Sequence, residues 1–251
     1  RQLWMYPSTV HSSLGGFLSG GSGGTGTIAH GSNDRGFVVA LDVVTPASAG
    51  ELVHLEGEAA QGFVHNYGTA GIIARATVRL EPLQDWRGLY ASFPDFSGAL
   101  SVLRSLGRLT PLPRLVSADT PHVTAQLPPD DAFPEGRSSL RMIADIATVP
   151  EATALIEAAG GRIEDVREGA NVSSAISVLS YNHPIEWLQK SEPGVYFHVE
   201  GNLSEDKVRE AVKLLMEKKP RDYVAVLSHL HRLVKLDVQR RTADVQSAVA
   251  L

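Results

Sequence analysis

A stretch rich in glycine and serine near the start of the chain is the segment best suited to chemistry. Residues 13–31 read SLGGFLSGGSGGTGTIAHG, and eight of these nineteen residues are glycine. Because glycine weakens the interiors of helices and strands, this composition favours a loop. Backbone N–H groups in such a loop can come close to a phosphate or pyrophosphate. The stretch therefore predicts a site for a nucleotide cofactor.

The commonest dinucleotide-binding motif does not account for this stretch. Residues 21–26, GSGGTG, match G-x-G-x-x-G. That motif needs a strand before it and a helix after it. The preceding GGFLSG and the following TIAHGSNDRG favour neither element, and we expect no helix after the motif. The context therefore excludes a Rossmann fold. The P-loop signature G-x-x-x-x-G-K-S/T is absent from the sequence, which excludes the standard nucleotide hydrolase.

The composition narrows the class of protein further. The 251 residues are 43% hydrophobic, enough for one large domain or two small ones. There are 23 basic against 28 acidic residues, so we expect no nucleic-acid or membrane partner. The sequence has no cysteine, no apolar run of membrane-spanning length and no signal peptide, which favours a cytoplasmic protein. It begins with Arg1, which suggests part of a longer product.

The first third of the chain reads as a small antiparallel β structure. Residues 37–45, FVVALDVVT, form an apolar, β-branched strand, and the turn at 46–50 leads to a second strand at 51–56. Residues 71–81, GIIARATVRLE, alternate between apolar and polar side chains and predict a third strand that Pro82 ends.

The rest of the chain alternates between strands and helices. The expected strands are 88–93, one or two within 115–127, 140–146, 162–166 and 195–200; the expected helices are 97–106, 149–159 and 203–218, with a helical tail at 219–251. Asp95 or Ser97 can cap the first helix, and Gly107 can end it. The order β-α-β-β-α-β predicts a ferredoxin-like α+β domain from about 87 to 218.

Four short segments occur in an order that resembles a known family. They are Ser13–Gly16, the small residues Ser19–Gly24, the pair His30-Gly31 and the segment Tyr67–Ile73, YGTAGII. The order is similar to the second FAD-binding subdomain of the vanillyl-alcohol oxidase and p-cresol methylhydroxylase family. There the corresponding segments are T-I/L-G-G, a small-residue run, an aromatic–glycine pair and E-G-x-x-G-I-I-T.

A later segment strengthens the resemblance. Residues 180–190, SYNHPIEWLQK, look like the W-N-H-T-T-L-H-A-L-K motif in the cap of bacterial FAD-linked oxidoreductases. Pro184 and Ile185 stand where that motif has threonines, and Trp187 stands where it has a second histidine. The likeness extends over roughly residues 7–200. The family's first FAD subdomain, with its P-x-G-x-G-T loop, and its D-P-x-G-x-x-N-P-G-K ending have no counterpart in this chain.

The resemblance implies a fold, a cofactor and a reaction. The expected fold class is α+β, with a partial FAD-binding domain of the p-cresol methylhydroxylase (PCMH) type at 1–86 and a ferredoxin-like cap at 87–251. The implied activity passes a hydride from a small hydroxy acid or alcohol to N5 of FAD. We expect a homo-oligomer or association with the missing FAD subdomain. The implied cofactor contacts are Ser13, Gly15, Gly16, Ser19, Gly20, Gly23, Ile28, Ile72 and Ile73.

The cap motif supplies the candidate catalytic residues. The resemblance implies that His183 and Asn182 face the flavin, with His183 as a substrate contact or base. A structural role for His183, in which it bonds a loop carbonyl, is an equal alternative. His229 and His231 lie two residues apart and would diverge on a helix, so we expect no metal site. A second hypothesis for the whole chain is a remnant of the fold that binds or organises other molecules without a cofactor.

Overall fold

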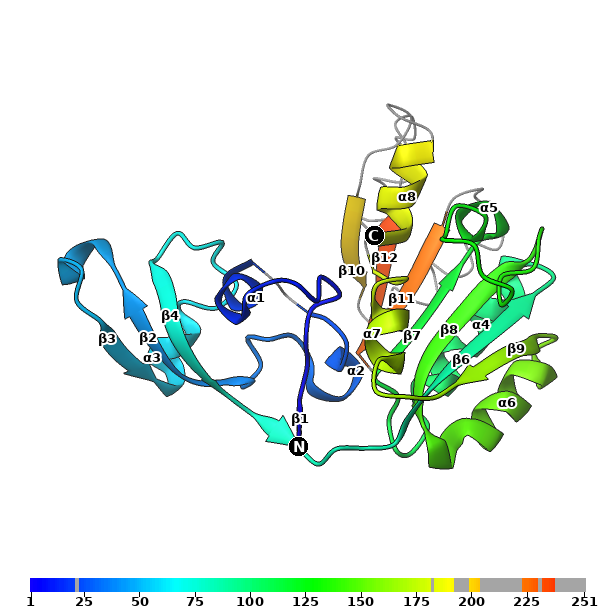
Figure 1. Cartoon of the computed structure of the whole chain (residues 1–251), viewed down its shortest axis with the longest axis horizontal. Coiled ribbons are helices and arrows are strands. Elements are labelled where there is room, and N and C mark those ends of the chain that lie inside the picture. Colours follow the sequence, from blue (N-terminus) through cyan, green and yellow to red (C-terminus); the bar gives the residue numbers. More distant parts are fainter. Residues whose placement is uncertain (21–22, 182, 192–198, 204–222, 230–231, 238–251) are drawn as a thin grey trace. The chain divides into compact units, whose positions relative to one another are not determined.

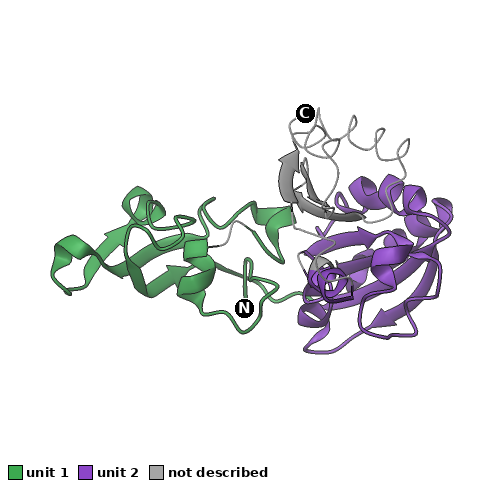
Figure 2. Cartoon of the chain, turned by 90° about the horizontal axis from the view of Figure 1, so that it is seen from above, with its two compact units in different colours: residues 1–84 green, residues 85–251 purple. Residues whose placement is uncertain are grey.

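The computed structural model describes residues 1–20, 23–181, 183–191, 199–203, 223–229 and 232–237 (Figure 1). The chain divides into two compact units, Arg1–Gln84 and Asp85–Leu251 (Figure 2). This division lies two residues before the boundary expected from the sequence, and each unit has its own sheet and core. Among the described residues, no helix is long and apolar enough to cross a membrane.

Unit 1 is built around a three-stranded antiparallel sheet in the order β3-β2-β4. The hairpin of β2 (Val38–Val44) and β3 (Val53–Glu56) is confirmed, and β4 (Ile72–Val78) pairs with the other edge of β2. The expected single strand at 71–81 is wrong in one respect, because the chain leaves this sheet after Val78. Its continuation, β5 (Leu80–Glu81), pairs with β1 (Gln2–Leu3) in a separate small sheet.

The expected glycine-rich loop contains two short helices, which corrects the prediction from composition. Helix α1 spans Leu14–Gly20, and α2 is one turn at Thr27–His30. In α1 the side chains of Phe17 and Leu18 are buried in the core of unit 1, together with Phe37, Leu41 and Val43 of the sheet region. Burial of two large side chains outweighs the low helix propensity of the glycines, because tertiary packing supplies most of the stability of a short helix. Helix α3 (Gly57–Gln61) completes the unit.

Unit 2 is a mixed structure around a seven-stranded sheet in the order β10-β12-β11-β7-β8-β6-β9, in which all neighbours are antiparallel. Its strands are β6 (Trp86–Phe93), β7 (Leu115–Asp119), β8 (Ser138–Asp145), β9 (Arg162–Arg167), β10 (Val199–Leu203), β11 (Tyr223–His229) and β12 (Arg232–Asp237). The expected β-α-β-β-α-β order is confirmed in β6, α4 (Phe96–Leu106), β7, β8, α6 (Val149–Ala158) and β9. Asp95 is the N-cap of α4 and accepts from the backbone N–H of Gly98.

Three expectations for unit 2 are wrong. The ferredoxin-like order ends at Arg167 and not near 218, because the later strands β10, β11 and β12 extend the sheet beyond β7. The segment 115–127 holds one strand followed by the short helix α5 (Pro121–Thr124), since Pro121 begins a helix turn. The tail expected to be helical contains the strands β11 and β12. Each strand is stabilised by pairing with the other, which local propensity does not reveal. The expected helix at 203–218 lies outside the described residues, except that Leu203 ends β10.

The two faces of the unit 2 sheet differ in chemistry. Phe93 of β6 packs against α4 and α6, near Gly98 and Gly161. On the opposite face, Gly88 lies beneath helix α7 (Val172–Ser177). Because successive residues of a strand alternate between faces, Leu140 and Met142 lie on the α4–α6 face, while Ser139 and Arg141 lie on the α7 face. The α7 face therefore carries buried polar side chains that the packing of a core does not require.

Candidate functional site

In unit 1 the structure brings two of the sequence motifs together. The backbone N–H of His65 donates to the carbonyl of Leu18 at 2.7 Å, and that of Tyr67 donates to Ser19 at 2.7 Å. These bonds hold the loop before β4 against the end of α1. At the other end of α1, a Cβ on Gly15 would lie 3.2 Å from the carbonyl oxygen of Ile73. The glycine-rich stretch and the YGTAGII segment are therefore in contact.

One side of α1 presents small residues to the surface. Ser13, Gly16 and Gly20 are exposed, and their spacing of three and then four residues places them on one helix face. The hydroxyl of Ser13 accepts from the backbone N–H of Gly16 at 3.1 Å. A Cβ on Gly16 would meet only that hydroxyl, at 3.2 Å, and a Cβ on Gly20 would meet nothing within 4 Å. This face, here called the α1 face, leaves room at Gly20 for a bulky group close to the backbone, as a bound nucleotide would require.

Other expected cofactor residues are occupied by contacts within unit 1. A Cβ on Gly23 would lie 3.1 Å from the Thr27 hydroxyl oxygen. The side chain of Ile28 is 1% exposed. The expected cofactor contact of Ile28 cannot run through its side chain, because α2 turns that side chain into the interior of unit 1. Ile73 packs against the core, whereas Ile72 is 72% exposed at the start of β4.

Part of the glycine content serves the fold itself. Gly24 and Gly26 lie directly against the backbone of residues 4–6, where a Cβ would collide with the carbonyl oxygens of Tyr6 and Trp4. Gly26 also has a φ of 108°, a conformation that side chains disfavour. Glycine therefore has two uses among the described residues of the glycine-rich stretch. Gly24 and Gly26 let the backbone pack closely, whereas a Cβ on Gly16 or Gly20 would meet no backbone atom from another part of unit 1.

Asn33 is a buried residue of this region that the sequence did not single out. Its side chain is fully buried, and its Nδ2 donates to the carbonyl of Phe17 at 3.1 Å. Its Oδ1 has no hydrogen-bond partner among the described residues. Asn33 thus ties the middle of α1 to the loop after α2. In the sequence it stands in SNDRG, which reads as an ordinary surface turn.

In unit 2 the expected catalytic histidine begins helix α8 (His183–Ser191). Its side chain is 17% exposed, its Nδ1 lies 3.6 Å from an oxygen of Glu186, and its ring centroid lies 6.3 Å from that of Trp187. Its backbone N–H donates to the carbonyl of Ser180 at 3.3 Å. Asn182, the other expected catalytic residue, lies outside the described residues.

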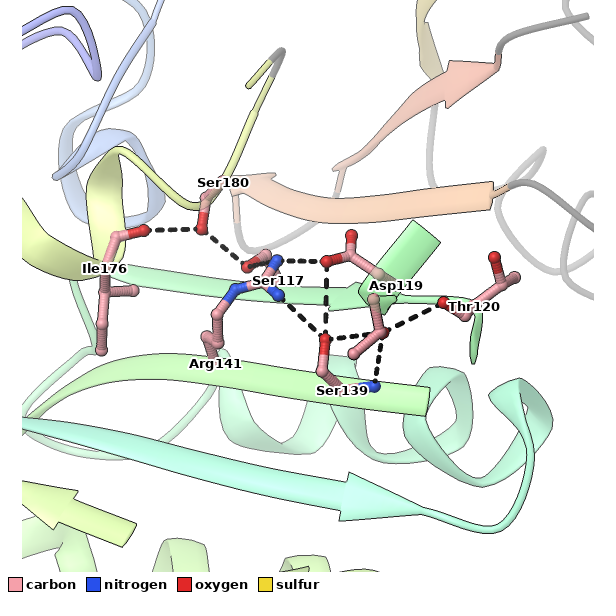
Figure 3. Close-up of polar contacts among 8 residues, drawn as sticks. Ser117, Asp119, Thr120, Ser139, Arg141, Ile176 and Ser180 are labelled. Carbon is pink, nitrogen blue, oxygen red and sulfur yellow. Dashed lines mark hydrogen bonds and ion pairs between the residues drawn. The ribbon is translucent and has the colours of Figure 1, made fainter. Parts of the chain in front are cut away.

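The turn before α8 rests on a buried polar network (Figure 3). Arg141 and Asp119 are both fully buried, with Nη2 of the arginine 2.5 Å from Oδ2 of the aspartate. Nη1 of Arg141 donates to the hydroxyl of Ser139 at 2.9 Å. Burial raises the pKa of the Asp119 carboxyl, and the charge of Arg141 opposes that rise. Oδ1 of Asp119 and Nε of Arg141 have no partner among the described residues.

This network continues from the sheet to the segment that carries His183. Nη2 of Arg141 donates to the hydroxyl of Ser117 at 3.3 Å, and the hydroxyls of Ser117 and Ser180 are 2.9 Å apart. The hydroxyl of Ser180 donates to the carbonyl of Ile176 at 2.9 Å. These residues were not among those expected from the sequence to form a site. The available signal was the alternation in SSLRMIAD, where Ser139 and Arg141 alternate with the apolar residues Leu140 and Met142.

Comparisons with known proteins identify the class of fold but not the activity. No protein-family model matches the chain, and no curated protein matches its sequence. Two solved structures, both of alkyldihydroxyacetonephosphate synthase, in crystal forms P1 and P212121, are similar to it. The first is 15% identical with a TM-score of 0.64, covering 99% of this chain and 54% of the synthase; the second is 16% identical with a TM-score of 0.63, covering 98% and 52%.

The likeness fixes the class of fold. The chain has a mixed α/β structure with antiparallel sheets that matches an FAD-binding oxidase-like fold in part, as expected. It spans about half the length of the synthase structures.

Proposed function

We propose that this chain is part of an FAD-dependent oxidoreductase that takes a hydride from a small hydroxy acid or alcohol. The observation that carries the proposal is the α1 face: Ser13, Gly16 and Gly20 lie exposed beside the YGTAGII segment. This is where the resemblance in sequence implies that the cofactor binds. The FAD-binding oxidase-like fold supports the same function.

Unit 1 would hold the cofactor through its backbone. Open space at Gly20, and the absence at Gly16 of any close neighbour except the Ser13 hydroxyl, would let the pyrophosphate and ribityl parts of FAD approach the main chain. The Ser13 hydroxyl accepts from Gly16 and keeps its own proton for donation to an oxygen of the cofactor. The exposed Ile72 side chain adds apolar area beside this face. Ser19, whose carbonyl accepts from Tyr67, is a further candidate for a hydroxyl contact.

Unit 2 would act as the cap over the substrate. When bound, FAD supplies an acceptor for hydride at its N5 atom. His183 is the proposed substrate contact or base, because an imidazole nitrogen can accept a proton from a substrate hydroxyl group. Asn182 is proposed to orient the substrate beside it. A second chain or subdomain would complete the cofactor site, because this chain spans about half of the matched structures.

The experiment uses the protein encoded by the whole gene, purified and examined for the absorption bands of bound flavin. Under anaerobic conditions, small 2-hydroxy acids and primary alcohols are tested as reductants of that flavin. We expect a yellow protein that loses its colour when a 2-hydroxy acid or a primary alcohol reduces the bound flavin. The change His183→Ala is expected to slow flavin reduction at an unchanged melting temperature, while the matched change at exposed His11 has no effect. A protein that stays colourless after incubation with FAD would contradict the proposal and favour the cofactor-free remnant.

A further inference from the structure

We propose that Ser180, Ser117 and Arg141 are positioning residues that hold the segment carrying His183 against the sheet of unit 2. This inference rests on the proposed function, because it gives the buried network a role through His183. Ser180 stands three residues before His183, and its carbonyl accepts from the His183 backbone N–H. A shift of Ser180 therefore moves the first turn of α8.

The hydrogen bonds of the network run in one direction. Arg141 can only donate, so the Ser117 hydroxyl accepts from it and donates to the Ser180 hydroxyl, which in turn donates to the carbonyl of Ile176. In such a chain each bond polarises the next. Asp119 fixes the far end, because its carboxylate holds the guanidinium of Arg141 in a site with no exposure to solvent (Figure 3).

Helix α7 supplies the second anchor of the same segment. A Cβ on Gly88 would lie 2.7 Å from Val172 Cγ2 and 2.9 Å from Ile176 Cδ1, so the absence of a side chain at Gly88 lets α7 lie directly on the sheet. This contact fixes Ile176, whose carbonyl receives the last bond of the network. Tyr181 then turns the chain in a left-handed conformation, with a φ of 57°. The described residues that follow α7, 178–181, are thus held by the polar network on one side and by α7 on the other.

The polar network on the α7 face is better suited to orienting the segment before His183 than to stabilising the fold. A buried ion pair loses its hydration, and apolar residues of similar volume often give equal or better stability. The α4–α6 face of the same strands is packed with apolar side chains such as Leu140 and Met142. On the α7 face, directional hydrogen bonds from Arg141 and Ser117 take the place of apolar contacts where Ser180 attaches. Directional bonds select one register of a segment, whereas apolar contacts tolerate several.

The first test measures amide hydrogen exchange in the 251-residue chain. In Ser180→Ala and in Ser117→Ala, we expect the rate of amide exchange in the segment 181–191 to rise about tenfold. This is the effect expected from the loss of one buried hydrogen bond. Helices α4 and α6 are expected to keep their protection, and Ser180→Thr, which retains the hydroxyl, should restore slow exchange. The matched control is Ser174→Ala in α7, where the hydroxyl donates to the carbonyl of Asn171 and has no bond to the network among the described residues. Unchanged exchange, or equal loosening of α4 and α6, would overturn the proposal.

The second test is a double-mutant cycle on flavin reduction in the holoprotein. If Ser180 acts through His183, Ser180→Ala slows reduction in the native background and adds nothing to His183→Ala. Additive effects of the two changes would overturn the positioning role. If exchange loosens as expected but neither change alters reduction, the network holds the segment as proposed and the catalytic role of His183 fails. The two proposals are therefore separable.

Discussion

Gly15 and Ile73 fix the distance between the glycine-rich stretch and the first residues of β4. A Cβ on Gly15 would approach the carbonyl oxygen of Ile73 to 3.2 Å and its Cβ to 3.6 Å. These two residues belong to different motifs, separated by 58 positions in the sequence (73 minus 15). Their contact explains how two segments that each read as a short glycine motif form one surface.

The first prediction compares two glycines of α1. Gly15→Ala is expected to lower the free energy of unfolding of unit 1 by about 1 kcal/mol, because the backbone of β4 has to move away. Gly20→Ala meets open space and should leave stability within about 0.5 kcal/mol or raise it slightly. Urea unfolding of the two variants measures the difference. Equal stabilities would show that α1 does not press on β4.

The second prediction concerns the buried pair of unit 2. Arg141→Met leaves the Asp119 carboxylate buried without its partner and is expected to cost about 3–5 kcal/mol at neutral pH. The control is Arg162→Met, which removes the ion pair that the exposed Arg162 side chain makes with Glu164 and should cost at most about 1 kcal/mol. Thermal or denaturant unfolding distinguishes them. A loss no greater than that of the control would mean that the pair does not stabilise unit 2.

The pH dependence of Arg141→Met has a definite sign. Burial already raises the pKa of Asp119, and removal of the arginine raises it further. The folded variant then binds a proton that the unfolded chain, with a pKa of about 3.9, has released. The cost of the substitution should therefore be small near the unfolded pKa and grow as pH rises to the folded pKa. Unfolding at a series of pH values tests this, and a cost that grows towards acid pH would contradict it.

The third prediction concerns His54 on the open face of the unit 1 sheet. A hydrogen bond from its Nδ1 to Asp42, at 2.6 Å, and a second bond to Glu56 raise the pKa of the imidazole. The hydrogen bond to His54 lowers the pKa of Asp42 despite some desolvation. A raised histidine pKa stabilises the fold below the unfolded value, about 6.5, and this contribution disappears as pH rises through the folded value.

Titration by NMR tests the His54 prediction directly. Asp42→Asn should bring the pKa of His54 back towards its ordinary value, and Glu56→Gln should do so to a smaller extent. Glu58→Gln, on helix α3, serves as the control. The stability difference between the native chain and His54→Gln should be present at pH 5 and vanish well above the folded pKa of His54. An unshifted imidazole would show that the pair does not form in solution.

The fourth prediction concerns the affinity of the 251-residue chain for FAD. The chain spans about half of each matched structure. We expect tight binding of the FAD pyrophosphate to need hydrogen-bond donors from a second subdomain as well, whereas in this chain only unit 1 would supply them. Titration followed by flavin fluorescence should show no saturable site in the low micromolar range, which corresponds to roughly 8 kcal/mol of binding. Tight one-to-one binding would mean that unit 1 carries the affinity by itself.

Local patterns in the sequence were sufficient for some of the regular elements. The β-branched run at β2, the cap at Asp95 and the stop at Gly107 gave the hairpin and helix α4, since these signals depend on a few neighbouring residues. The sequence failed where distant partners decide the structure. Helix α1 forms because Phe17 and Leu18 reach the core, and β11 pairs with β7, more than 100 positions earlier (224 minus 119 at one pair).

The candidate site was foreseen in part for the same reason. The motif order indicated the right segments, because Ser13 and Gly16 carry their pattern locally. It could not separate Gly16 from Gly23, whose neighbour Thr27 becomes visible only in three dimensions. The buried Arg141 and Asp119 come from different strands, and no spacing in the sequence relates them. Ser180, which joins this network through the Ser117 hydroxyl, is equally remote in the sequence.

The most direct test of the flavin proposal is the flavin content of Gly16→Val in the protein encoded by the whole gene. Gly16 is exposed, and a Cβ there meets only the Ser13 hydroxyl, so valine can be accommodated by unit 1 but fills the α1 face. The account predicts that the variant keeps the melting temperature of the apoprotein and emerges from gel filtration without flavin, while the native protein retains it. A variant that purifies fully loaded with FAD would show that the cofactor does not lie against the α1 face.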